Sequence, residues 1–132
     1  MSLNECGEPV MKSIALFEQF VDLPELLGRI ENDEELLVEL FTLFLDDFPR
    51  KRTELQAAIE SGNLDEIERT AHAIKGVLAN LSAQRAASLA AEIESVARDG
   101  KLPKIQKAVA AFNLEATGFY SAVDAFMSGA DK

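Results

Sequence analysis

An α-helical hairpin is predicted by residues 63–100, which read NLDEIERTAHAIKGVLANLSAQRAASLAAEIESVARDG. Asn63 and Glu66 stand three residues apart, as in a capping box in which Asn replaces the usual Ser or Thr. A helix is therefore expected over residues 64–80. A second helix follows over about 83–99, and the link between the two is so short that they must run antiparallel.

Residues that start or end helices delimit this hairpin and the segments around it. Ser82 is expected to cap the second helix, and Gly100 to close it in a left-handed conformation. Pro103 opens a last helix that runs to about Met127. Upstream of the hairpin, Gly62 is a natural C-terminal cap for a preceding helix.

The helix before the hairpin has a wide apolar face. Its apolar residues recur at three- and four-residue spacing, namely Leu36, Leu37, Leu40, Phe41, Phe44, Leu45 and Phe48. Asn32 or Asp33 can cap its start, and Pro49 must kink or restart it. Further upstream, Asp22 can cap a short helix that ends near Ile30.

Ala and Leu are the two commonest residues, and both are strong helix formers. Short alternating runs bounded by turn pairs, which would indicate strands, are missing. The sequence therefore predicts an all-α fold, an up-and-down antiparallel four-helix bundle with a short extra N-terminal helix. We expect residues 1–21 to form an N-terminal extension that is partly loose, and residues 22–132 to form one bundle domain.

The chain of 132 residues carries 13 Lys and Arg against 23 Asp and Glu, a net charge of -10. Because nucleic-acid binding depends on clustered cations, this excess of acids argues against a nucleic-acid partner. Residues 1–47 hold 12 acids and 2 bases, so the whole net charge lies there, whereas residues 48–132 hold 11 of each. Residues 48–132, which include the only histidine, therefore carry no net charge.

One Cys and one His can form neither an intrachain disulfide nor a zinc site of Cys and His ligands. We therefore expect no metal and no cofactor in this chain. No apolar run approaches the ~18 residues of a membrane span, and the N-terminus lacks the pattern of a signal peptide. We expect no membrane partner, a cytoplasmic location and a monomer.

The single histidine, His72, is predicted to lie outside the core. At about 100° per residue, an apolar stripe falls within about 60° of the direction opposite to it, formed by Ile67, Ile74, Val77, Leu78 and Leu81. The face of His72 itself carries charges and very small residues, namely Asp65, Glu68, Arg69, Lys75, Gly76 and Ala79. A lone histidine is more often structural than functional, but an exposed imidazole in an open patch favours a function.

Four residues could assist this imidazole. Gly76, which costs the helix about 1 kcal/mol relative to Ala, clears room one turn beyond the ring. Lys75 could bring its ammonium to an anion on the ring, although a solvated surface charge is an equally ordinary interpretation. Antiparallel register brings Glu94 level with His72, where a carboxylate that accepts from Nδ1–H would leave Nε2 nucleophilic. Arg98 could add a second cation, although a surface ion pair is the more ordinary interpretation.

The same residues resemble a known family, the histidine-containing phosphotransfer (HPt) domains. The resemblance is carried by AHAIKG at 71–76, NLSA at 80–83 and EIE at 92–94, and it covers most of residues 22–127. The run FLDDFP at 44–49 looks like the preceding helix and proline of the family. His-x-x-Lys-Gly alone is a weak pattern, but the helical frame and the intact downstream spacing make it specific.

The resemblance implies a phosphocarrier of a two-component phosphorelay, which accepts a phosphoryl group from an aspartyl phosphate of a receiver domain and passes it to another receiver. It implies that His72 is phosphorylated, that Lys75 stabilises the phosphate and that Gly76 gives access. Glu94 stands where family members often have a polar side chain facing the ring, and Arg98 where only some members are basic. The receiver, in a response regulator or hybrid kinase, would supply Mg²⁺.

One departure from the family is Ser82, which stands at the turn where a second glycine is usual. Because Ser can cap the following helix, the turn should survive, and the change should affect packing or partner fit more than chemistry.

Other chemistry has less support. Asp46 and Asp47 diverge by about 100° on a helix, so they suit a solvated face better than a metal pair. No GxxxxGK or GxGxxG loop is present, so we expect no autonomous kinase activity. Because the chain has no kinase or receiver domain, a free-standing carrier is expected. Two alternatives stay open: a module that docks receivers with little or no phosphotransfer, and an unrelated four-helix protein whose histidine is accidental.

Overall fold

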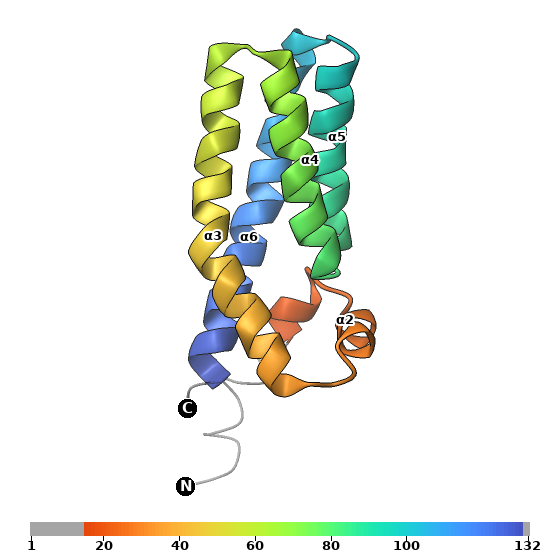
Figure 1. Cartoon of the computed structure of the whole chain (residues 1–132), viewed down its shortest axis with the longest axis vertical. Coiled ribbons are helices and arrows are strands. Elements are labelled where there is room, and N and C mark those ends of the chain that lie inside the picture. Colours follow the sequence, from red (N-terminus) through yellow and green to blue (C-terminus); the bar gives the residue numbers. More distant parts are fainter. Residues whose placement is uncertain (1–14, 131–132) are drawn as a thin grey trace, which may run out of the picture.

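The computed structural model describes residues 15–130 of the chain. Its elements are α2 (Leu23–Arg29), α3 (Glu34–Ser61), α4 (Leu64–Asn80), α5 (Gln84–Arg98), a 3₁₀ turn η1 (Leu102–Lys104) and α6 (Ile105–Ala130). The four long helices run alternately up and down (Figure 1), and the described residues contain no strand. The prediction of an all-α antiparallel four-helix bundle with a short extra N-terminal helix is confirmed.

Side-chain caps start three of the helices at the residues that the sequence indicated. Each cap accepts a hydrogen bond of 3.1 Å from the backbone N–H three residues later. The caps are Asp22 for α2, Asp33 for α3 and Asn63 for α4. Gly62 and Gly100 follow α3 and α5 with left-handed φ angles of 71° and 72°, so both predicted helix ends are confirmed.

Pro49 bends α3 without interrupting it. The helix is continuous from Glu34 to Ser61, and Figure 1 shows it changing direction between its orange and yellow parts. Proline has no N–H to donate to the carbonyl of Leu45, four residues back. The hydroxyl of Tyr120 on α6 donates to that oxygen at 3.0 Å. The tertiary structure thus satisfies the acceptor that the proline leaves open, and the helix does not need to restart.

Aromatic side chains fill the end of the bundle where α3 begins and α6 ends. The ring centroid of Phe17 lies 5.1 Å from those of Phe41 and Phe126, and the Phe17 side chain is fully buried. Packing of this kind is worth about 0.5–1.5 kcal/mol per aromatic pair beyond the area buried. The packed core therefore begins upstream of the expected boundary at residue 22, while residues 1–14 lie outside the described residues.

Small residues allow α4 and α5 to pack against each other more extensively than any other pair of helices. The α5 side of the bundle core is made largely of alanines, namely Ala86, Ala87, Ala90 and Ala97. Short side chains let two helix backbones approach closely. Polar side chains at the edge of this contact can therefore reach across from one helix to the other.

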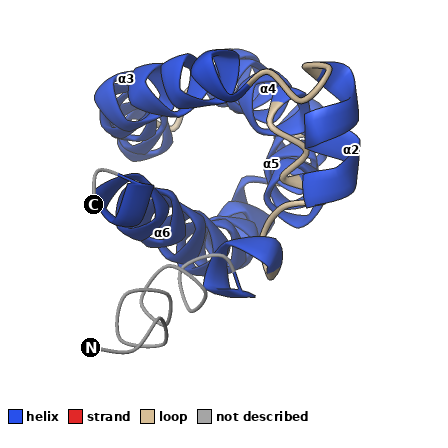
Figure 2. Ribbon diagram, turned by 90° about the horizontal axis from the view of Figure 1, so that it is seen from below, coloured by secondary structure: helices blue, strands red, loops and turns tan. Residues whose placement is uncertain are grey.

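The short helix α2 covers the end of the bundle where α4 turns into α5 (Figures 1 and 2). Arg29 donates from Nη1 to the carbonyl of Ala79 at 3.0 Å, and the backbone N–H of Asp22 donates to the carbonyl of Ser82 at 3.0 Å. Ala79 lies in the last turn of α4 and Ser82 in the turn that follows, so both bonds tie this turn to the N-terminal segment. The short segment thus holds the turn in place.

Ser82 adopts a different role from the one expected. Its φ is +59° and its side chain is fully buried. The N-cap of α5 is Ala83, which makes no side-chain cap bond. The predicted capping by Ser82 is therefore wrong. The turn instead needs a left-handed residue after α4, a conformation that glycine adopts without strain.

We expect Ser82→Gly to raise the free energy of unfolding by about 1 kcal/mol, because glycine adopts the left-handed conformation of this turn without strain. The greater freedom of glycine in the unfolded chain offsets part of this gain. Urea denaturation measures the change. The matched variant Ser88→Gly, on the exposed side of α5, should instead lose about 0.5 kcal/mol. An equal loss in both variants would contradict this account of the turn.

Candidate functional site

The side chain of His72 projects from the solvent-facing side of α4. It is 65% exposed, whereas Ile67, Ile74 and Leu78 on the opposite face are completely buried. Val77, at the edge of the predicted apolar stripe, is partly buried. The prediction of an outward-facing imidazole opposite the core is confirmed, and its exposure follows directly from the helical periodicity.

Glu94 on α5 reaches the imidazole across the contact between α4 and α5. Its Oε2 lies 2.9 Å from Nδ1 of His72, and its side chain is only 8% exposed. An ionised carboxylate can only accept a hydrogen bond, so Nδ1 carries the proton and donates it to Glu94. The other ring nitrogen, Nε2, then has a free lone pair. This is the tautomer that a nucleophilic histidine requires.

Two cations complete the surroundings of Glu94. The ammonium of Lys75 lies 2.9 Å from Oε1, and Nη2 of Arg98 donates to Oε2 at 2.8 Å. Lys75 is therefore paired, and the structure does not show it as an isolated solvated charge. The buried carboxylate has three partners, which is how proteins accommodate a charge that has lost most of its water.

Arg98 also contacts a residue that the sequence analysis did not single out for a role. Its Nε donates to Oε2 of Glu68 at 2.9 Å. In the antiparallel register, Glu68 lies level with Arg98 in the way that His72 lies level with Glu94. The available signal was the position of Glu68 one turn before the histidine, on the same face of α4. Charge alone could not show which cation it would meet.

Hydrogen bonds determine the charge state of Glu94. Burial by itself would raise the pKa of this carboxyl group, but hydrogen bonds from Lys75 and His72, together with their charges, outweigh burial. The net effect is a pKa below the ordinary value of 4.5. Glu94 is therefore a carboxylate at neutral pH.

Open space surrounds the imidazole on both sides along α4. A Cβ placed on Gly76 would have no atom within 4 Å outside the local helix backbone, so the glycine leaves the surface beside the ring unfilled. On the other side lies a shallow hollow of about 370 Å³, lined by Asp65, Glu68, Arg69, His72 and Glu94. A group attached to Nε2 can thus be approached by another macromolecule without rearrangement of the bundle.

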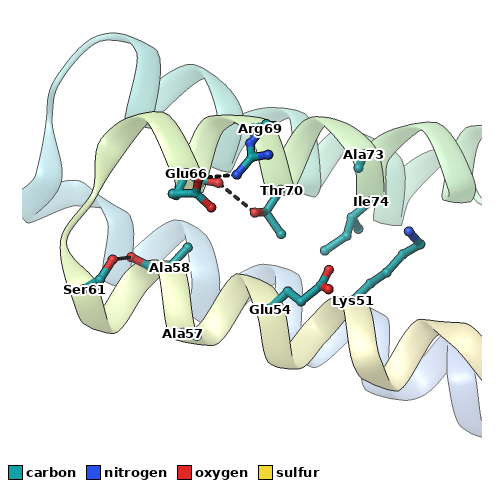
Figure 3. A pocket seen from close by; sticks show the side chains of 10 residues that line it. All are labelled: Lys51, Glu54, Ala57, Ala58, Ser61, Glu66, Arg69, Thr70, Ala73 and Ile74. Atoms are coloured by element: carbon teal, nitrogen blue, oxygen red, sulfur yellow. Dashed lines mark hydrogen bonds and ion pairs between the residues drawn. The ribbon is translucent and has the colours of Figure 1, made fainter.

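A separate groove of about 490 Å³ runs between α3 and α4 (Figure 3). It shares only Arg69 with the lining of the hollow beside His72. Arg69 pairs with Glu66, and Lys51 and Glu54 place opposite charges on its α3 side. Its apolar lining residues are Ala57, Ala58, Ala73 and Ile74. The charged residues that have partners pair along their own helices, Arg69 with Glu66 and Lys51 with Asp47.

Asp46 and Asp47 do not form a metal pair in this structure. Asp47 pairs with Arg50 and Lys51 on its own helix. Within residues 15–130, no three His, Cys, Asp or Glu side chains come together as a metal site would require. Nor does any helix in that range combine the length and apolar character of a membrane span.

A family model described as "Hpt domain" matches residues 39–126, which is more than half of the chain. The matched range contains His72, Lys75, Gly76, Glu94 and Arg98. No curated protein and no solved structure matches the chain.

We expect the contribution of Glu94 to stability to depend on pH. Because its folded-state pKa lies below 4.5, the contribution is fully present above the pKa of the unfolded chain and is lost as the pH falls through the folded-state pKa. The difference in free energy of unfolding between the wild type and Glu94→Gln should therefore be smaller at about pH 3 than at about pH 7. Urea denaturation at both values measures it.

Glu92→Gln is the control variant, because it also removes one carboxylate from α5 but breaks no ion pair. This side chain is exposed and forms no ion pair with any residue that the structure describes. A difference for Glu94→Gln that grows as the pH falls would contradict the assigned direction.

Proposed function

The chain belongs to the family of Hpt domains, which are phosphotransfer modules of two-component signalling, and from this we propose that it is a phosphorelay carrier phosphorylated at Nε2 of His72. In this proposal, His72 accepts the phosphoryl group from an aspartyl phosphate of one receiver domain and passes it to another. The chain acts as a carrier without kinase activity of its own.

The observation that carries the proposal is the hydrogen bond between His72 and Glu94. A hydrogen bond to a carboxylate requires the proton on Nδ1 and so leaves the lone pair of Nε2 free, on a side chain that is mostly exposed. A nucleophile that must enter the active site of another protein needs both properties. An accidental surface histidine would need neither a buried carboxylate nor the adjacent glycine.

The transfer step balances with these residues alone. The Nε2 lone pair of His72 attacks the phosphorus, an N–P bond forms, and the P–O bond to the receiver aspartate breaks as its carboxylate takes the electron pair. The Nδ1 proton stays on the ring, so the phosphorylated imidazole carries a positive charge. The carboxylate of Glu94 stabilises this charge directly.

Onward transfer is the same step in reverse. The carboxylate of the second receiver attacks the phosphorus, the N–P bond breaks, and the electron pair returns to Nε2. Because Nδ1 is still protonated, the leaving group is neutral imidazole, which departs more easily than an imidazolate. Glu94 thus supports both directions of transfer by keeping that proton in place.

The remaining residues supply charge and access in this proposal. Lys75, which contacts Glu94 in the resting state, can turn toward the phosphoryl oxygens, since its flexible stem allows its ammonium to move. Arg98 provides a second cation at the same carboxylate. Mg²⁺ and the acidic pocket belong to the receiver.

A module that docks receivers without exchanging phosphate is the alternative function, and the first experiment below separates the two.

We expect label from a phosphorylated receiver to appear on the purified chain as acid-labile, alkali-stable phosphate, and to be absent from His72→Gln. Gel autoradiography with a panel of receivers measures the transfer. The variant should keep its helical circular dichroism because the side chain is exposed. Receiver binding without label would support docking alone, and label that persists in His72→Gln would refute the assigned site.

A graded series at Gly76 tests access to the ring. Gly76→Ala should stabilise α4 by about 1 kcal/mol and keep transfer, because its Cβ meets only open space. Gly76→Leu should also fold, but it should slow transfer at least about tenfold because its side chain extends over the ring. Quenched-flow transfer assays and thermal unfolding on the same preparations separate the two effects. Normal rates in Gly76→Leu would exclude this surface as the docking site.

A further inference from the structure

Arg98 lies between two carboxylates that belong to different parts of the site. Its Nη2 donates to the buried Glu94 at 2.8 Å, and its Nε donates to Glu68 at 2.9 Å. Glu68 does not touch the imidazole in any hydrogen bond of the described residues, yet it lines the hollow beside His72. It therefore acts on the site through the guanidinium.

The resting cluster has no spare positive charge. The two negative charges of Glu94 and Glu68 balance the two positive charges of Lys75 and Arg98. A phosphoryl group at Nε2 brings two negative charges against one positive charge on the ring, so the cluster becomes net negative. Any cation that stabilises the phosphoryl oxygens must first leave a carboxylate that it already contacts.

The two contacts of Arg98 differ in how easily they break. Glu94 is 8% exposed, whereas Glu68 is 34% and Arg98 is 56% exposed. Half-exposed ion pairs are worth little, typically under about 1 kcal/mol, because water replaces them readily. Glu68 and a phosphoryl group on His72 would therefore compete for the same N–H donors of Arg98, and the exposed contact with Glu68 is strong enough to change that competition by only a few-fold.

We propose that Glu68 is a positioning residue that holds Arg98 away from the phosphoryl group and so keeps phospho-His72 short-lived and ready for onward transfer. This inference rests on the proposed function. Without Glu68, the guanidinium would be free to turn on its remaining contact with Glu94 and to donate to the phosphoryl oxygens. The equilibrium between the aspartyl phosphate of the receiver and phospho-His72 would then shift toward phospho-His72.

The test uses the full chain phosphorylated by a receiver and then freed from it. Glu68→Gln should lengthen the lifetime of the label by about three- to fivefold, and should shift the equilibrium between receiver and His72 toward His72 by a similar factor. Loss of label is hydrolysis, in which water attacks the phosphorus and the N–P electron pair returns to Nε2. Gel autoradiography over time measures both quantities.

Two matched variants separate positioning from simple charge. Asp65→Asn removes one negative charge from the same face of α4, where Asp65 has no hydrogen bond or ion pair with Arg98, and should change the lifetime by at most about 1.5-fold. In an Arg98→Ala background, Glu68→Gln should lose its effect, because the residue through which it acts is gone.

The outcomes are distinct. Absence of label from wild-type His72 would overturn the proposed function itself. Normal labelling with an unchanged or shorter lifetime in Glu68→Gln would overturn only the role of Glu68. That role is also overturned if Asp65→Asn lengthens the lifetime equally, or if the effect of Glu68→Gln persists without Arg98.

Discussion

The carboxylate of Glu94 is the group on which the arrangement of the site depends. A charge that is almost removed from water is tolerated only when donors surround it, and here three side chains provide them. The same bonds orient the imidazole, favour the tautomer with the proton on Nδ1 and hold two cations beside the carboxylate of Glu94. Loss of any one of these side chains would therefore change the hydrogen bonds and the charge balance of the other three.

The cluster in turn depends on the register of the helical hairpin. α4 and α5 approach closely because alanines line their contact, and the left-handed residue Ser82 sets the turn between them. The short helix α2 fixes that turn through bonds from Arg29 and from the backbone of Asp22. A shift by one residue in α5 would move Glu94 by about 100° around its helix and away from the ring.

Charge is distributed unevenly along the chain, and His72 lies in the part that carries no net charge. All of the net charge of -10 lies in residues 1–47, which include α2 and the first half of α3. The segment that contains α4, α5 and α6 is balanced. Within it, the cluster around His72 pairs two acids with two bases. Under the proposed function, a phosphoryl group on His72 would make this balanced cluster net negative.

The sequence by itself determined the helices, most of their caps and the exposure of His72 on the outer face of α4, because helical periodicity and capping are local properties of a chain. It also placed Glu94 near the ring, since a short link fixes antiparallel register. Only the tertiary structure decided that Ser82 is left-handed, that Tyr120 satisfies the carbonyl opened by Pro49, and that Glu68 shares Arg98 with Glu94. The contacts of Tyr120 and Glu68 depend on which group of another helix reaches a given atom, and a local sequence pattern carries no information about that.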